Sequence, residues 1–111
     1  MQSSPAFKMT AVASAAVLAA RFVGMFTGAH CAAGAKAQGI ANYPAAVDEA
    51  FAVTVLGTEV VESGGAYAAG VALKSDATGR AIAQAGAGEI VAWSRTAVAA
   101  AGVMNEVLLA L

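Results

Sequence analysis

The sequence is short of the residues that most often carry chemistry. It has one cysteine, Cys31, and one histidine, His30, in 111 residues. A single cysteine excludes an internal disulfide, and the pair falls short of the ligand set of a structural zinc site. On a strand, the two adjacent side chains would point to opposite faces, which a Cys-His catalytic pair cannot use. We therefore expect no enzyme activity, no metal and no cofactor.

Charge is scarce as well. Charged residues make up 12% of the chain, against about 25% in average soluble domains, and the formal net charge is −1. The six Lys and Arg residues are scattered and form no basic stripe, so the sequence predicts no nucleic-acid partner. Glycines at 86 and 88 begin a dinucleotide-binding pattern, but Val91 stands where its third glycine should be. We expect no small-molecule substrate.

Long hydrophobic runs are also missing. The most apolar early stretch, residues 9–20, ends at Arg21, whereas a membrane-spanning helix needs about 20 apolar residues. We therefore expect no membrane segment. Lys8 followed by the apolar residues 11–20 does fit the pattern of a signal peptide. A small secreted β protein that loses residues 1–20 is for this reason kept as an alternative.

The sequence is rich in small apolar residues. Hydrophobic residues make up 59% of the chain and aromatic residues only 6%, and alanine is the most frequent type. Burial stabilises by about 25 cal/mol per Å² of apolar surface, so a core of Ala and Val gains little per residue. A domain this short benefits from further burial against neighbours. The composition therefore predicts a subunit of an assembly.

Short apolar runs separated by turn residues recur from Arg21 onward. The clearest is 49–56, where Phe51, Val53 and Val55 alternate with smaller side chains before Gly57 breaks the run. The other predicted strands cover 21–26, 36–42, 58–62, 71–74, 80–84, 89–94 and 103–111. This spacing is typical of small antiparallel folds. We predict a mainly β fold, a small single-domain β-sandwich or β-barrel over residues 21–111.

Residues 1–20 are predicted to form an extended N-terminal arm, partly flexible. They begin with polar residues, then turn alanine-rich, and lack a capping box that would announce a helix. A short helical turn is expected at 15–20. Farther on, Ala-Ala-Gly occurs at 32–34, 68–70 and 100–102. It marks either an internal repeat or a recurring loop in which glycine admits an unusual backbone conformation.

The few bulky side chains are candidates for two roles. Most are expected to fill the core, where alanine leaves space, while one or two could anchor a partner protein. Trp, Tyr and Arg dominate the energetics of protein interfaces, and Arg suits a contact with a partner's carboxylate. The possible interface residues are Arg21, Phe22, Tyr43, Tyr67, Arg80, Trp93 and Arg95.

A family resemblance rests on a series of short segments. They are Arg-Phe-Val-Gly at 21–24, Cys-Ala-Ala-Gly-Ala-Lys-Ala-Gln-Gly-Ile-Ala at 31–41, Glu-Ala-Phe-Ala-Val-Thr-Val-Leu-Gly at 49–57, Gly-Val-Ala-Leu-Lys-Ser-Asp at 70–76, Gly-Arg-Ala at 79–81, Ala-Gly at 101–102 and Val-Leu-Leu at 107–109. The series resembles the small capsid cement or head decoration proteins of tailed phages, over most of the chain from about Arg21. Its motifs are compositional and positional, not catalytic.

The resemblance implies a structural virion protein that acts by binding alone. Such a protein is made in the host cytoplasm, binds the major capsid protein on the outer capsid surface and stabilises contacts between its subunits. It is expected to be a homo-oligomer, with a trimer favoured. The alternative within the same class is another minor virion structural protein, such as a head fibre base or a tail component.

Overall fold

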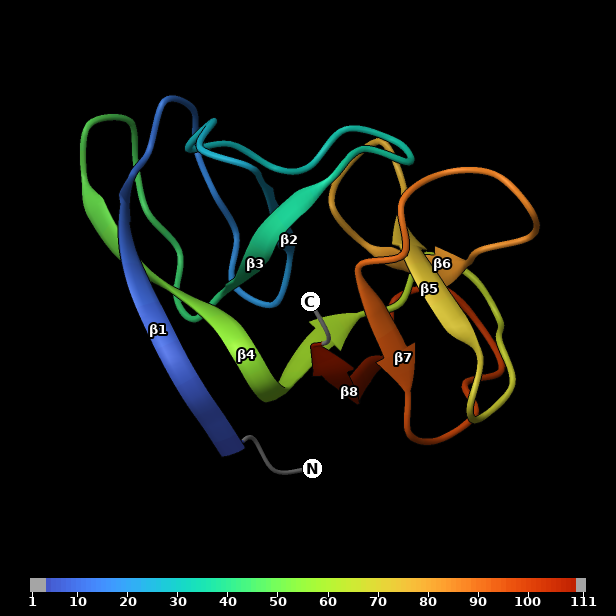
Figure 1. Cartoon of the computed structure of the whole chain (residues 1–111). Coiled ribbons are helices and arrows are strands. Elements are labelled where there is room, and N and C mark those ends of the chain that lie inside the picture. The colour runs from blue at the N-terminus through green and yellow to red at the C-terminus, as the bar shows by residue number, and fades with distance from the viewer. Residues whose placement is uncertain (1–3, 110–111) are drawn as a thin grey trace.

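Eight strands follow one another in the computed structural model, which describes residues 4–109 (Figure 1). They are β1 (Ser4–Val12), β2 (Phe22–Gly24), β3 (Ala37–Ala41), β4 (Ala50–Glu62), β5 (Ala72–Ser75), β6 (Ala81–Ala83), β7 (Ala92–Ser94) and β8 (Met104–Leu109). Every strand after β1 overlaps a predicted run, so the mainly β fold is confirmed. Among the described residues, no helix is long and apolar enough to span a membrane.

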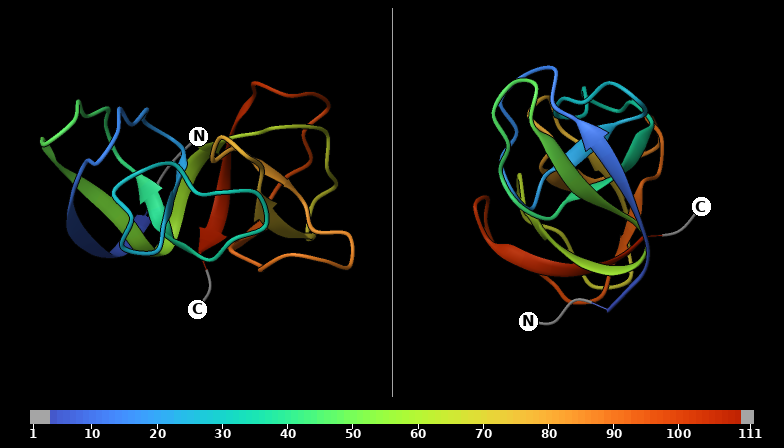
Figure 2. Two further views of the ribbon diagram at one scale, coloured as in Figure 1. Left: turned by 90° about the horizontal axis from the view of Figure 1, so that it is seen from above. Right: turned by 90° about the vertical axis from the view of Figure 1, so that its left-hand side faces the viewer.

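The strands belong to one sheet that curls back on itself. Its order is β2-β3-β4-β8-β7-β5-β6, with β1 paired to β4 beside this path. Ser63, directly after β4, bridges Ala81 of β6. The Phe22 N–H of β2 donates to the Gly79 carbonyl, 2.7 Å away and just before β6. These contacts bring the ends of the sheet together into a nearly closed, barrel-shaped fold (Figure 2).

Strand β4 holds the sheet together. Its first half pairs with β1 and with β3, and its second half pairs with β8. The predicted break at Gly57 is wrong, because the strand runs through this residue at a φ of 102°. Glycine alone adopts this backbone region at little cost, so the strand passes through Gly57 and keeps its pairing on both sides. Figure 1 shows that β4 bends along its length.

The two halves of the chain repeat one architecture around β4. Val17 and Ala45 exchange two backbone hydrogen bonds of 2.8 and 3.0 Å, and Tyr67 and Val98 exchange two of 3.1 and 3.0 Å. Pairing of β1 with the first half of β4 corresponds to pairing of the second half of β4 with β8. Likewise, β3 beside β4 corresponds to β7 beside β8. The chain therefore contains an internal duplication that shares its central strand.

Two of the Ala-Ala-Gly motifs lie in the second half of the duplication and end at left-handed residues. Gly70 and Gly102, which close the motifs at 68–70 and 100–102, have left-handed φ values of 74° and 82°. The corresponding residues of the first half are Ala20 and Asp48, with φ values of 59° and 69°. The Ala-Ala-Gly motif therefore does not mark the duplication, because both motifs lie in the second half and the equivalent positions of the first half are not glycine. The third motif, ending at Gly34, lies outside this correspondence.

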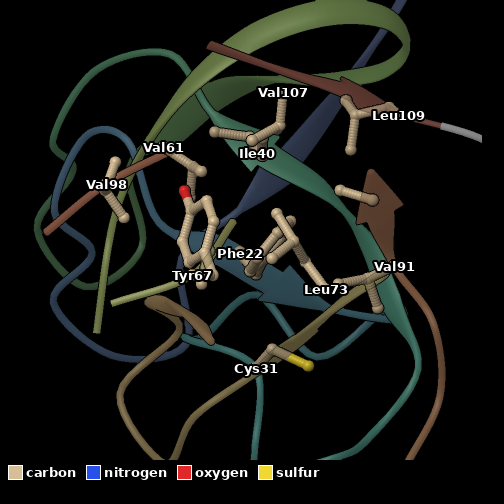
Figure 3. Close-up of a cluster of buried hydrophobic side chains, with 12 residues drawn as sticks. Phe22, Cys31, Ile40, Val61, Tyr67, Leu73, Val91, Val98, Val107 and Leu109 are labelled. Carbon is tan, nitrogen blue, oxygen red and sulfur yellow. The ribbon is translucent and has the colours of Figure 1, made fainter. Parts of the chain in front are cut away.

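Two apolar clusters fill the interior. The larger one is built around Phe22, Ile40 and Leu73, all fully buried, and joins β2, β3, β5, β7 and β8 (Figure 3). The smaller one lies under β1 and the first half of β4, around Phe51 and Val53. Most side chains that complete both clusters are Ala and Val, as the composition predicts.

The structure ties most of the predicted arm into the sheet. Residues 4–12 form β1 and pair antiparallel with β4, and Ala13 and Val17 are buried in the smaller cluster. The helical turn predicted at 15–20 is wrong, because the backbone of Val17 is paired with Ala45. The first three residues of the predicted arm lie outside the described part of the chain.

Candidate protein-contact surface

Two of the predicted interface residues belong to the core. Phe22 is fully buried in the larger cluster, and Tyr67 is buried beside it (Figure 3). The Tyr67 hydroxyl accepts a hydrogen bond of 2.9 Å from the Asn105 side-chain amide, which satisfies the polar end of the ring. Burial leaves neither side chain available to a partner of the folded chain, so the interface hypothesis is corrected for both.

Trp93 is the reverse case. Its side chain is 40% exposed, so of the two roles considered for the bulky residues it takes the position at the surface. Strand β7 buries Ala92 and Ser94 on either side of it, so alternation directs the large ring outward. Across the sheet, Trp93 lies opposite Leu108 of β8, which is also exposed. A cross-strand pair of an aromatic and an aliphatic side chain therefore faces solvent.

Further exposed apolar residues extend this face. Leu108 lies opposite Thr58 of β4, and Leu56, two residues earlier on β4, is paired with Phe7 of β1. We call Phe7, Leu56, Trp93 and Leu108 the outer patch; each is more than a third exposed. A gathering of large exposed apolar side chains on a sheet marks a protein contact more often than isolated ones do.

Arg95 lies next to the outer patch with its charge already paired. Its guanidinium donates to the Glu106 carboxylate of β8, and its side chain is more than half exposed. Exposed ion pairs of this kind contribute about 0–1 kcal/mol to stability. The pair leaves this part of the face neutral, with an Arg beside a Trp, the composition typical of interface anchors. Of the predicted residues, Trp93 and Arg95 thus lie near each other.

Arg21 and Arg80 are engaged inside the molecule. Both guanidinium groups lie 3.4 Å from the Glu62 carboxylate, and Arg80 also pairs with Asp76. Burial alone would raise the pKa of the Asp76 carboxyl, but hydrogen bonds from Arg80 and Thr78 hold the pKa below its ordinary value. The cluster fastens the 76–80 turn to the end of β4. The main role of these two arginines is therefore to stabilise the fold.

His30 and Cys31 occupy structural positions. The imidazole Nε2 of His30 accepts a hydrogen bond of 2.9 Å from the Leu18 N–H. Partial burial, and then the charge of Arg21, hold the His30 pKa below its ordinary value. Cys31 is fully buried, and burial raises the pKa of its thiol, which disfavours the reactive thiolate. Residues 4–109 contain no group of three or more His, Cys, Asp or Glu placed to hold a metal ion.

Tyr43 and Phe26 stand at the surface on loops. Tyr43, a predicted interface residue, is about half exposed before Pro44. Phe26, which the sequence analysis did not select, is the most exposed large apolar residue described, at 76%. It lies in the turn between β2 and β3 at a left-handed φ of 58°, which an aromatic residue rarely adopts. The only signal in the sequence was its position at the end of the predicted strand 21–26.

Two shallow grooves flank this turn. The first, of about 200 Å³, is lined by Met25, Lys36, Ala37, Gln38, Gly39, Val55, Glu89, Ile90, Val91 and Leu109. The second, of about 230 Å³, is lined by Met9, Thr10, Ala11, Val12, Phe26, Thr27, Gly28 and Gln38. Met25 and Phe26 line different grooves, so the turn stands between them. The arrangement offers apolar holes for side chains of another protein, not a deep pocket for a small molecule.

Comparison with known proteins gives a likeness in structure. No protein-family model matches the sequence, and no curated protein matches it. The fold is similar to the crystal structure of the N base of the head fibre protein gp8.5 of bacteriophage phi29, with a TM-score of 0.78. The likeness covers 94% of this chain and 93% of that one, at 17% sequence identity. The two proteins therefore share a fold over nearly their whole length.

Proposed function

We propose that the chain is a structural protein of a tailed-phage head, which binds the outer surface of the capsid as the base module of a head fibre does. The observation that carries this proposal is the shared fold with a head fibre base over nearly the full length of both chains. A fold by itself does not set function. The proposal therefore also relies on the surface of this chain.

The surface supports a role in binding. The outer patch sets Trp93 and Leu108 next to the neutral Arg95–Glu106 pair. Phe26 and its two grooves add a second exposed apolar region. The titratable groups of the interior, in contrast, are bonded to the fold itself, as His30 is to Leu18. We propose that the protein acts by binding alone, with the major capsid protein and further copies of itself, in a trimer, as partners.

Capsid cement is the second candidate for the same surface. The sequence resemblance favours it, whereas the fold comparison favours the head fibre base. A secreted β protein is the weakest candidate, because removal of residues 1–20 would take away β1 and the buried Val17.

The test is sedimentation of the purified protein with empty, expanded heads of the phage that encodes it. We expect co-sedimentation that saturates. The Trp93→Ser and Leu108→Ser variants should bind at least about 30-fold more weakly, as for interface anchors worth about 2 kcal/mol. Val47→Ser, which alters an equally exposed apolar residue of a loop, serves as the matched control. Absence of binding by the wild-type protein would contradict the proposal.

A second readout separates the two candidates. Saturated heads are heated, and release of their contents is followed against bare heads. A cement protein raises the temperature of release because it binds the intact shell more tightly than the opened one. A fibre base that needs only an attachment point leaves this temperature unchanged. The proposal of a fibre base predicts the second result.

A further inference from the structure

The turn between β2 and β3 exposes an aromatic side chain that the fold does not require. Phe26 is 76% exposed and has a left-handed φ of 58°. Two hydrogen bonds hold the turn: the Gly24 N–H donates to the Ala29 carbonyl at 3.0 Å, and the Ser14 hydroxyl donates to the Thr27 carbonyl at 2.6 Å. Strain of this kind at an exposed position points to a function outside the isolated domain.

The internal duplication provides a built-in comparison. The corresponding turn of the second half, between β5 and β6, spans residues 76–80. Its left-handed residue is Gly79, and the Asp76 carboxylate closes it by accepting from the N–H groups of Thr78 and Arg80 at 2.9 Å each. Gly79 corresponds to Gly28, which also has a left-handed φ, 68°, directly before the residue that closes its turn. Phe26 is a second left-handed residue, which the 76–80 turn does without. Folding therefore does not explain a phenylalanine at the tip of the first turn.

The first groove fits such a side chain. Its volume is about 200 Å³, and a dry cavity of about 150 Å³ is enough to hold a benzene ring. Val91 and Leu109, which line it, are almost fully buried, whereas Ile90 at its rim is half exposed. The groove contains one Lys and one Glu and is neutral in sum, and the turn from Gly24 to Ala29 carries no charge. Lys36 and Glu89 are both exposed, and the seated turn would add no charge of its own beside them.

We propose that Phe26 of one copy of the chain inserts into the first groove of a second copy. Phe26 and the first groove lie side by side on the same molecule, because Met25, the residue before Phe26 in the sequence, lines this groove. A contact of this kind, repeated around a symmetry axis near the turn, closes into a small ring. The inference builds on the self-association in the proposed function and assigns it a surface.

The experiment measures the dissociation constant of the homo-oligomer by sedimentation equilibrium, together with the thermal midpoint of each variant. Asparagine tolerates the left-handed region. Phe26→Asn should therefore leave the midpoint unchanged or raise it, while the dissociation constant rises at least about 30-fold. Val47→Ser is the control and should change the constant less than about threefold. A lowered midpoint with unchanged association would overturn the proposal, and so would a wild-type protein that stays monomeric.

A groove variant tests the other side of the contact. Ala37→Leu places a larger side chain in the first groove and should weaken association of the wild-type turn. The double variant Ala37→Leu with Phe26→Ala should regain part of the association that Phe26→Ala alone loses. The larger side chain at position 37 fills space that the smaller side chain at position 26 leaves empty. Strictly additive effects of the two changes would contradict insertion at this groove. Head binding is measured separately, so failure of this contact leaves the proposed function testable.

Discussion

At the scale of single residues, the molecule uses its few polar side chains to fix loops. His30 holds the segment before β2 through the Leu18 N–H, and Asp76 closes the turn before β6. The sequence shows that these residues are present but not what they bond to, because each partner comes from a distant loop or a turn. The same holds for Trp93, whose outward direction depends on small neighbours that point inward.

His30 makes stability depend on pH. In the folded chain the His30 pKa lies below its ordinary value, so the folded state resists protonation that the unfolded state accepts. Stability is therefore fully present above about pH 6.5, the ordinary histidine pKa, and falls as the pH drops from there toward the lowered pKa of the folded state.

The measurement is the free energy of unfolding by urea at pH 7.5 and 5.0. We expect the wild-type protein to lose stability at pH 5.0, and His30→Gln to lose less. Measurements at pH 5 and above avoid the titration of Asp76, because the lowered pKa of its carboxyl lies at more acid pH. An equal loss in both proteins would show that His30 is not the source.

At the scale of elements, alternation and turn residues predicted most of the strands. Phe51 and Val53 are buried as the alternation requires, but the pattern fails at the next two residues, because Thr54 is fully buried and Val55 only partly. Strand β1 was missed because its pairing with β4 is a long-range contact that its own sequence does not announce. The internal repeat was obscured for a related reason, since Ala20 and Asp48 occupy left-handed positions where the second half has glycine.

The substitution Gly57→Ala tests whether β4 needs a glycine at this position. The Gly57 φ of 102° lies where alanine is strained, so Gly57→Ala should lower the free energy of unfolding by about 1–3 kcal/mol. Gly65→Ala is the control, because Gly65 lies outside the left-handed region and a Cβ there meets nothing within 4 Å. Chemical denaturation of both variants gives the two values. Equal effects at the two sites would show that the left-handed φ of Gly57 is not the cause of the lost stability.

At the scale of the whole molecule, the two halves share β4 and cannot separate without breaking it. We therefore expect one cooperative unfolding transition. Leu73→Ala in the second half and Val53→Ala in the first should each shift that single transition, with the leucine change costing about 2–5 kcal/mol. Trp93 fluorescence and far-ultraviolet circular dichroism are compared. Two separate transitions would mean that the halves fold independently.

We propose that the exposed apolar surfaces of this small barrel are completed by other molecules of a phage head. The most direct test is an electron cryomicroscopy map of heads saturated with the protein, compared with bare heads. The account predicts added density on the outer surface into which this fold fits, with the outer patch of Trp93 and Leu108 against the shell or a neighbouring subunit. Heads that show no added density, under conditions where the protein is folded and in excess, would contradict it.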